Sequence, residues 1–402
     1  MQIAGIIAEY NPLHCGHTRL MERIREQCGP ETAILCVMSG NFVQRGDFAI
    51  LGKHRRAEAA VKSGADLVLE LPLPWAVSSA ERFADGGVQT LIETGLTTHL
   101  AFGSECGEVA ALQRLAAGLT GEAFPALLRR ELTRGVSFAA ARQAAMSRLL
   151  QAEDAKLLET PNNILGVEYC KSLLRRGSSI QPLALLREGA SHDSASPEEN
   201  YPSASALRAL LENGRQEEAL KKMPPAMASA CEGEILAGRA PVFSGLCERA
   251  MLARLRSMTE ADFAALDEGN EGLCHRLYAA SRTAATLADL LDAAKTKRYA
   301  YARLRRMVLW AYLGLTPADV PARPPYLRVL AANETGRALL SRMKKTAALP
   351  LLTKPADVRR LSPEARRLFE LEVRATDLYT LAYPDLSAAV GGGEWREGPV
   401  IL

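Results

Sequence analysis

The chain has 402 residues, so two folded domains are expected, and a chain of this length can bury a full core without disulfide bonds or metals. Hydrophobic residues make up 48% and charged residues 24%, which is typical of a globular protein, and no apolar run is long enough for a membrane span. The eight cysteines form no Cys-x-x-Cys pair, so we expect reduced thiols and a cytoplasmic location. The net charge of +3 is too small to indicate a nucleic-acid partner, so local clusters must decide that question.

The first half of the chain alternates short apolar runs with helical stretches. The predicted strands are Ile3–Ala8, Ala33–Met38, Asp66–Leu71, Thr98–Phe102 and Ile180–Leu186. The predicted helices cover residues 17–27, 53–63, 78–94, most of 109–177, and 205–212. Ile3–Ala8 lacks a basic leader and runs directly into Glu9, which favours a strand over a signal peptide. This alternation predicts a Rossmann-like α/β fold with a parallel sheet and helices on both faces.

The same alternation predicts where a ligand would bind. Ligands of parallel sheets lie beyond the carboxyl ends of the strands. We therefore expect the loops Glu9–Gly16, Ser39–Gly46 and Gly103–Gly107 to open on one crevice. The polar segment 188–205 resembles an exposed lid in its composition.

The pattern becomes mostly helical after about residue 220. We therefore predict an ATP-binding domain over residues 1–220 and a mainly helical domain over 221–402. Two strand-like pieces, YLRVLA and LPLLT, lie between Pro321 and Pro355, and a last helix is expected from Pro363 to about Ala382. Gly391–Gly393 is expected to begin a loose tail.

The segment from Gly5 to His17 carries the strongest chemical signal. A buried strand leads through an Asn-Pro turn into His14-Cys-Gly-His17 at the start of a helix. A helix N-terminus offers unpaired N–H groups and a positive dipole end to an anion, and Gly16 permits close approach of a phosphate. Two imidazoles at this place can donate hydrogen bonds that strengthen as charge builds on phosphate oxygens. The alternatives are a metal-binding pair, for which we find no further Cys/His partners, or ordinary surface histidines.

Several separate stretches together resemble one family. They are AEYNPLHCGH, MSGNFVQRG, KSGADLVLELP, AFGSE, PNNILGVEY, LREGASH and KRYAYARLRR. The first resembles the His-x-Gly-His signature of nucleotidyltransferases related to class I aminoacyl-tRNA synthetases, and the whole set resembles the bacterial tRNA(Met) cytidine acetate ligase family. That resemblance implies that ATP and acetate form acetyl-adenylate, and that the acetyl group then passes to the exocyclic amine of the wobble cytidine of elongator tRNA(Met).

The resemblance also implies an ATP site with His14 and His17 as catalytic groups. The residues expected to contact ATP are Ile7, Ala8, Glu9, Tyr10, Asn11, Pro12, Leu13, His14, Cys15, Gly16, His17, Thr18, Arg19, Leu20, Gly103, Asn162 and Arg187. Family members commonly have Phe and Asn where this chain has Leu13 and Cys15. The element Ser203-Ala-Ser205-Ala-Leu-Arg208 resembles the Ser-rich motif that ends such sites, and we interpret it as a lid over the triphosphate.

Each of these residues also has a simpler interpretation. Gly103 could be a turn glycine, Asn162 a helix cap and Arg187 a surface arginine with a buried stem. Arg45 and Lys53 flank the second crevice loop and could meet phosphate, RNA or solvent. Two acids, Glu9 and Glu105, lie near the expected phosphates, which suggests that Mg²⁺ accompanies ATP. Adenylate chemistry needs no thiol, so Cys15 is not assigned as a nucleophile.

A basic cluster near residue 300 is the candidate RNA-binding surface. It consists of Lys295, Lys297, Arg298, Arg303, Arg305 and Arg306, on a predicted helix beside Tyr299 and Tyr301. A second candidate patch holds Arg337, Arg342, Lys344 and Lys345, and either cluster could instead be a solvated helix face. Two other functions stay open: a cofactor adenylyltransferase, and a non-catalytic RNA-binding protein that responds to ATP.

Overall fold

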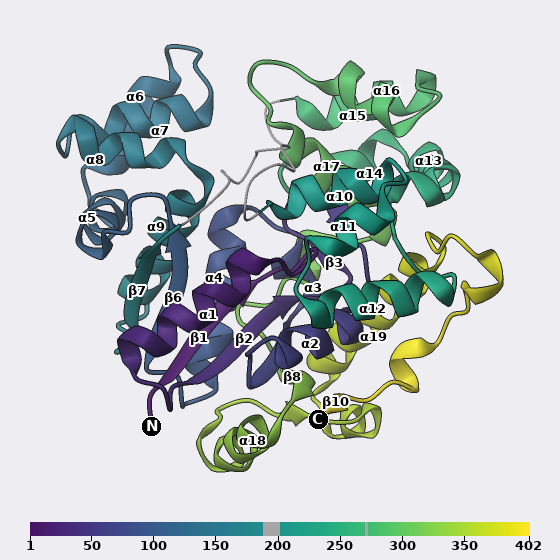
Figure 1. Cartoon of the computed structure of the whole chain (residues 1–402). Coiled ribbons are helices and arrows are strands. Elements are labelled where there is room, and N and C mark those ends of the chain that lie inside the picture. Colours follow the sequence, from purple (N-terminus) through teal and green to yellow (C-terminus); the bar gives the residue numbers. More distant parts are fainter. Residues whose placement is uncertain (188–201, 270–271) are drawn as a thin grey trace.

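The computed structural model describes residues 1–187, 202–269 and 272–402, and its centre is an eight-stranded sheet (Figure 1). The strand order is β10-β8-β5-β2-β1-β6-β7, with β9 beside β8. The strands are β1 (Ile3–Ala8), β2 (Ala33–Ser39), β5 (Leu67–Leu71), β6 (His99–Ser104), β7 (Gln181–Leu186), β8 (Leu327–Ala332), β9 (Leu351–Leu352) and β10 (Val400–Ile401). The expected lid, residues 188–205, lies mostly outside the described residues.

The first half of the sheet has the predicted parallel arrangement. β1 pairs with β2 from Ile3↔Ala33 to Ala8↔Met38, and β2, β5, β6 and β7 continue the parallel pairing on either side. Every residue of β1, β2 and β5 is buried, as expected for strands covered on both faces. Their carboxyl ends therefore meet at one edge of the sheet.

Helices cover both faces of the sheet. The first group is α1 (Cys15–Cys28), α2 (Lys53–Lys62), α3 (Leu73–Ala76), α4 (Ala80–Glu93), α5 (Val109–Thr120), α6 (Phe124–Leu132), α7 (Phe138–Met146), α8 (Ala152–Lys156) and α9 (Pro161–Arg175). The second is α10 (Ala204–Glu212), α11 (Gln216–Lys221), α12 (Pro225–Leu236), α13 (Glu248–Ser257), α14 (Glu260–Ala264), α15 (Leu273–Thr283), α16 (Leu287–Ala294), α17 (Tyr301–Leu313), α18 (Glu334–Thr346) and α19 (Pro363–Thr380). Since side chains alternate along a strand, Ile3 and Ile7 join one core cluster with α4 and α9, while Ala4 and Ile6 join another with α1, α2 and α12. No described helix combines the length and apolar character needed to cross a bilayer.

The C-terminal part of the chain extends the same sheet, and here one expectation is corrected. β8 pairs antiparallel with β5, so the sheet is mixed rather than wholly parallel. The expected loose tail is wrong, because β10 pairs with β8 through Val400↔Ala331 and Glu394 is only 2% exposed. The three glycines at 391–393 are typical of a flexible segment, so the sequence did not indicate that the chain after them pairs with the sheet. The division into two domains at residue 220 stays a prediction, and the sheet takes strands from both sides of it.

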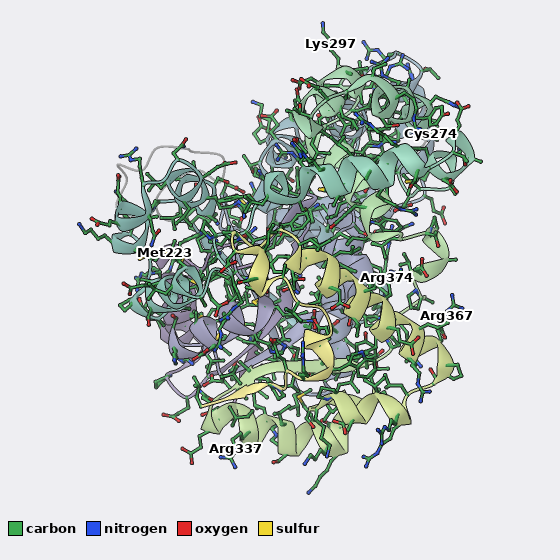
Figure 2. The ribbon with its side chains drawn as sticks, turned by 90° about the vertical axis from the view of Figure 1, so that its right-hand side faces the viewer. Met223, Cys274, Lys297, Arg337, Arg367 and Arg374 are labelled. Atoms are coloured by element: carbon green, nitrogen blue, oxygen red, sulfur yellow. The ribbon has the colours of Figure 1, made fainter. Side chains whose placement is uncertain are left out.

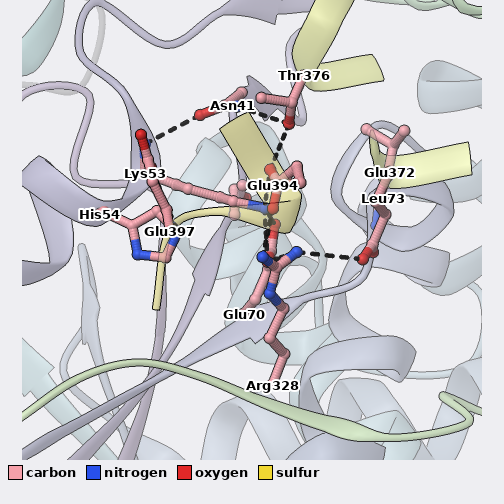
Figure 3. Close-up of polar contacts among 12 residues, drawn as sticks. Asn41, Lys53, His54, Glu70, Leu73, Arg328, Glu372, Thr376, Glu394 and Glu397 are labelled. Carbon is pink, nitrogen blue, oxygen red and sulfur yellow. Dashed lines mark hydrogen bonds and ion pairs between the residues drawn. The ribbon is translucent and has the colours of Figure 1, made fainter. Parts of the chain in front are cut away.

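A buried network of charges ties this C-terminal segment to the sheet (Figure 3). Lys53 Nζ lies 2.8 Å from Glu70 Oε1 and 2.7 Å from Glu394 Oε1. Arg328 pairs with Glu394 and lies 3.4 Å from Glu70, and all four side chains are almost fully buried. The suggestion that Lys53 meets phosphate or RNA is therefore wrong, because its ammonium group points into the protein.

Candidate active site

A cavity of about 820 Å³ opens at the carboxyl ends of the parallel strands. Its floor comes from the end of β1 and the start of α1, and Gly103, Asn162 and Arg187 form one wall. The opposite wall combines the hairpin of β3 (Phe42–Val43) and β4 (Asp47–Phe48) with residues of α10, α13, α16 and α17. The three loops expected to share one crevice all contribute to this cavity.

Backbone hydrogen bonds hold the imidazole rings of His14 and His17 side by side at the start of α1. His14 caps the helix, and its Nδ1 accepts a hydrogen bond from the Gly16 N–H at 3.1 Å. His17 Nδ1 accepts one from the His14 N–H, also at 3.1 Å, and the ring centroids are 3.7 Å apart. Because both Nδ1 atoms accept from the backbone, each neutral ring carries its proton on Nε2. Each ring can then donate a hydrogen bond through Nε2.

Most of the residues expected to contact ATP line this cavity. They are Ile7, Ala8, Glu9, Tyr10, Asn11, His14, His17, Leu20, Gly103, Asn162 and Arg187. Gly16 and Arg19 line a neighbouring pocket of about 60 Å³ that His14, His17 and Arg187 share. Pro12, Leu13, Cys15 and Thr18 line neither of these two cavities: Leu13 is buried in the core, and Cys15 Sγ lies 3.8 Å from the Lys222 carbonyl oxygen. Leu13, one departure from the family pattern, is therefore a packing residue.

Gly103 and Arg187 act as a pair. A Cβ atom on Gly103 would lie 3.1 Å from Arg187 Cγ, so the glycine makes room for the arginine stem. Burial lowers the pKa of the Arg187 guanidinium, and the nearby Glu105 opposes that shift. The glycine thus positions a cation at the cavity wall, in addition to the close ligand approach that the sequence suggested.

Glu105 is held by the N-terminus of α9. Its carboxylate accepts hydrogen bonds from the Asn162 side chain at 2.7 Å and from the N–H groups of Asn162 and Asn163. Burial opposes ionisation, but these hydrogen bonds outweigh it and leave the pKa of Glu105 below its ordinary value. An anion at a helix N-terminus is favourable, so Glu105 is a structural carboxylate that orients Asn162.

Two arginines organise the loops around the cavity. Arg208 donates to Asn11 Oδ1 at 3.0 Å, to the Phe48 carbonyl and to Asp47 Oδ2 at 2.7 Å, which ties α10 to the signature loop. Arg56 is completely buried and donates to the backbone carbonyls of Glu9, Ser39, Gly40 and Leu51. Sequence reasoning found Arg208 through its Ser-rich motif but missed Arg56 and Asp47, because their partners are set by the fold.

The basic cluster near residue 300 lies beside the cavity but is not one helical face. Lys295, Lys297 and Arg298 precede α17, so the prediction of a single helix is wrong there. Arg305 lines the cavity, Arg303 donates to the Glu268 carbonyl, and Lys297 extends from the surface (Figure 2). Arg306 is 8% exposed and forms two 2.7 Å hydrogen bonds with Glu268, so the prediction that it contacts RNA is wrong.

The second basic patch lies far from the cavity. Asn333 caps α18 and bonds to Asp66 at the amino end of β5, which is the opposite edge of the sheet. Figure 2 shows Lys297 and Arg337 at opposite ends of the molecule. The two patches therefore do not flank one crevice. No described group of His, Cys, Asp and Glu side chains is arranged to hold a metal ion.

Comparison with known proteins matches this architecture. A family model described as HIGH Nucleotidyl Transferase matches residues 1–391. Two curated relatives are named tRNA(Met) cytidine acetate ligase. The one from Acetivibrio thermocellus is 34% identical over all of both chains, and the one from Syntrophomonas wolfei is 35% identical over all of this chain and 99% of its own.

Solved structures agree over the whole chain. The apo crystal structure of Thermotoga maritima TmcAL is 33% identical, covers 100% of both chains and has a TM-score of 0.95. The same protein bound with alpha-thio ATP gives a TM-score of 0.94 at the same identity and coverage. The fold and the paired histidines define a nucleotidyltransferase of the HIGH class. The chain belongs, within that class, to the tRNA(Met) cytidine acetate ligase family.

Proposed function

We propose that this protein is an ATP-dependent acetate ligase that acetylates the exocyclic amine of the wobble cytidine in elongator tRNA(Met). The observation that carries the proposal is the backbone-locked pair His14 and His17 at the start of α1, on the floor of the large cavity. The family names of the relatives and the ATP analogue bound to the Thermotoga maritima protein support the same reaction. The free state of all eight cysteines fits action in the cytoplasm.

In the first step, an acetate oxygen attacks the α-phosphorus of ATP and pyrophosphate leaves. The Nε2–H groups of His14 and His17 are placed to donate to phosphate oxygens as their charge grows. Arg187 adds positive charge at the wall, and the N-terminus of α1 adds its dipole. Mg²⁺ would enter with the triphosphate, as part of the substrate. The protein thus contributes position and charge rather than a covalent group.

In the second step, the amine of the cytidine displaces AMP from acetyl-adenylate. The base must leave its stack for the amine to reach the acyl carbon, because it would otherwise be shielded within the anticodon loop. We place the loop against the helical wall, where Arg305 lines the cavity and where the exposed cations Lys297 and Arg298 precede α17 in the chain. The helical part after residue 220 would supply these RNA contacts together with Lys295 and Arg303.

The direct test is incubation with ATP, [¹⁴C]acetate and total tRNA, followed by nucleoside analysis. Label in acetylcytidine is expected, and replacing His14 and His17 by Ala should abolish it while tRNA binding persists. Label absent from cytidine with the unsubstituted protein would overturn the specific function.

Two further assays separate the alternatives. A cofactor adenylyltransferase would exchange pyrophosphate into ATP with a small phosphorylated substrate as the adenylyl acceptor and not with acetate, whereas the ligase requires acetate for that exchange. A non-catalytic RNA-binding protein would bind tRNA and show neither exchange nor acetylation. Buried Lys53 offers no RNA contact, so tRNA affinity should depend on Lys297 and Arg298 and not on that residue.

A further inference from the structure

Acetyl transfer to cytidine requires a proton acceptor, and the following inference rests on the proposed function. When the amine nitrogen bonds to the acyl carbon it must lose a proton to become an amide nitrogen. A positioned side chain that takes this proton typically accelerates such a step by about 10²–10⁴-fold. The cavity should therefore hold a carboxylate or another base near the acyl carbon.

The described acidic residues that line the cavity differ in their hydrogen-bond and ion-pair partners. Asp47 is paired with Arg208 at 2.7 Å, and Glu248 accepts from the Leu287 N–H at the start of α16. Glu212 lies on the exposed side of α10. Glu9 lies at the end of β1, between the Gly103 wall and the helical wall. Of these four acids, Glu9 is the one that belongs to the same loop as His14, on the cavity floor where the proposed function places ATP.

The side chain of Glu9 is held in position from two directions. Its Oε1 accepts a 2.7 Å hydrogen bond from the Gln44 N–H in the β3–β4 hairpin, and Arg56 binds its backbone carbonyl. Tyr10, the next residue, has a φ of 48°, a left-handed conformation that turns the chain sharply after Glu9. This turn lets the strand end in a carboxylate at the cavity floor while the chain continues to His14.

The surroundings of Glu9 favour proton uptake. Burial raises the pKa of its carboxyl group, and the Gln44 N–H and the cations Arg45, Arg56 and Arg208 oppose that shift. Tyr169 of α9 lies near the Glu9 carboxylate, and burial, together with the charge of Glu9, raises the pKa of its hydroxyl group. A carboxylate with a raised pKa is a better proton acceptor near neutral pH than an ordinary exposed one.

We propose that Glu9 is the catalytic base of the transfer step. As the N4 nitrogen of cytidine forms its bond to the acetyl carbon, Glu9 Oε2 takes one amine proton. The carbon–oxygen bond to the adenylate phosphate then breaks, and AMP leaves with that electron pair. The products are acetylcytidine, AMP and a protonated Glu9, which returns its proton to solvent.

The test compares the two half-reactions in Glu9→Gln. Because Glu9 also lines the ATP cavity, the two half-reactions are compared with each other: we expect single-turnover transfer from preformed acetyl-adenylate to tRNA to fall by about 10²–10⁴-fold, and far more than acetate-dependent ATP–pyrophosphate exchange. The transfer rate of the unsubstituted protein should rise with pH to a plateau, and Glu9→Gln should lose that inflection. Glu217→Gln, which makes the same change on the exposed face of α11, is the matched control and should leave both rates unchanged.

The failures are distinguishable. Equal loss of exchange and transfer in Glu9→Gln would assign the residue to ATP binding and overturn the proposal, as would transfer at the normal rate. Glu9→Asp keeps the carboxylate and shows whether the effect of Glu9→Gln is only a folding defect. It should retain the pH inflection of the transfer rate at a lower maximal rate. A folded Glu9→Asp protein without that inflection would overturn the proposal. Absence of acetylation by the unsubstituted protein would instead refute the proposed function.

Discussion

Removal of the buried cation Lys53 tests whether the interior charge network holds the C-terminal segment in place. Its ammonium group lies 2.8 Å from Glu70 and 2.7 Å from Glu394, and all three side chains are at most 5% exposed. Removing one partner of such a buried pair leaves an uncompensated charge and costs about 3–5 kcal/mol. We therefore expect Lys53→Met to lower the free energy of unfolding by that amount.

The corresponding shift in melting temperature follows from the length of the chain. An unfolding entropy of about 2 cal/mol/K per residue gives about 0.8 kcal/mol/K for 402 residues, so Lys53→Met should melt about 4–6 °C lower in calorimetry. Pairing it with Glu394→Leu removes one cation and one carboxylate together, and this double variant should recover part of the loss. A melting temperature within 1 °C of the original for Lys53→Met, or a double variant less stable than the sum of the singles, would refute this account.

Three further predictions concern the pH dependence of stability, the position of His14 and the contacts of Arg208. Burial, and then the charge of Glu70, raise the pKa of Glu372 to about 7 in the folded protein. Since the unfolded chain loses this proton at a lower pH, the free energy of unfolding measured in urea should fall as the pH rises from about 4.5 to about 7. Glu372→Gln should flatten that slope. In Gly16→Ala the new Cβ would lie 2.9 Å from His14 Cε1 and displace the imidazole ring. The rate of ATP–pyrophosphate exchange should therefore fall about 10²-fold at a nearly unchanged melting temperature. A normal exchange rate would contradict the role of the capped His14 in catalysis. Arg208→Lys loses the forked contacts to Asp47 and Phe48, so amide hydrogen exchange over residues 204–212 should quicken about tenfold, and unchanged exchange would count against the role of these contacts.

Local patterns predicted much of the catalytic half of the fold. The apolar run Ile3–Ala8 and the polar, glycine-containing stretch after it placed β1, the turn and the start of α1, because each depends on neighbouring residues. The ends of parallel strands at one edge of the sheet predicted that His14, Gly103 and Arg187 would share one cavity, whereas Asn162, at the start of α9, was predicted only through the family resemblance.

Interactions between distant parts of the chain could not be predicted in the same way. Nothing near Lys53 indicates that Glu394 will pair with it, and nothing near Arg306 indicates Glu268, so both cations looked like surface residues. The segment LRVLA was recognisable as a strand, but its antiparallel position beside β5 depends on contacts more than 250 residues away in sequence. Side-chain charge alone does not distinguish a solvated cation from one enclosed by carboxylates.

The return of the chain to its first sheet also matters during synthesis. Glu394 is translated about 320 residues after Glu70, which takes on the order of 15 to 65 s at roughly 5 to 20 residues per second. Until β8 (Leu327–Ala332) has been made, the side of β5 that it later covers is exposed on the ribosome, and throughout the whole interval Lys53 lacks one of its two carboxylates. A nascent chain that stops early therefore carries an open sheet edge and an incomplete charge cluster, which marks it for chaperones and proteases rather than for catalysis.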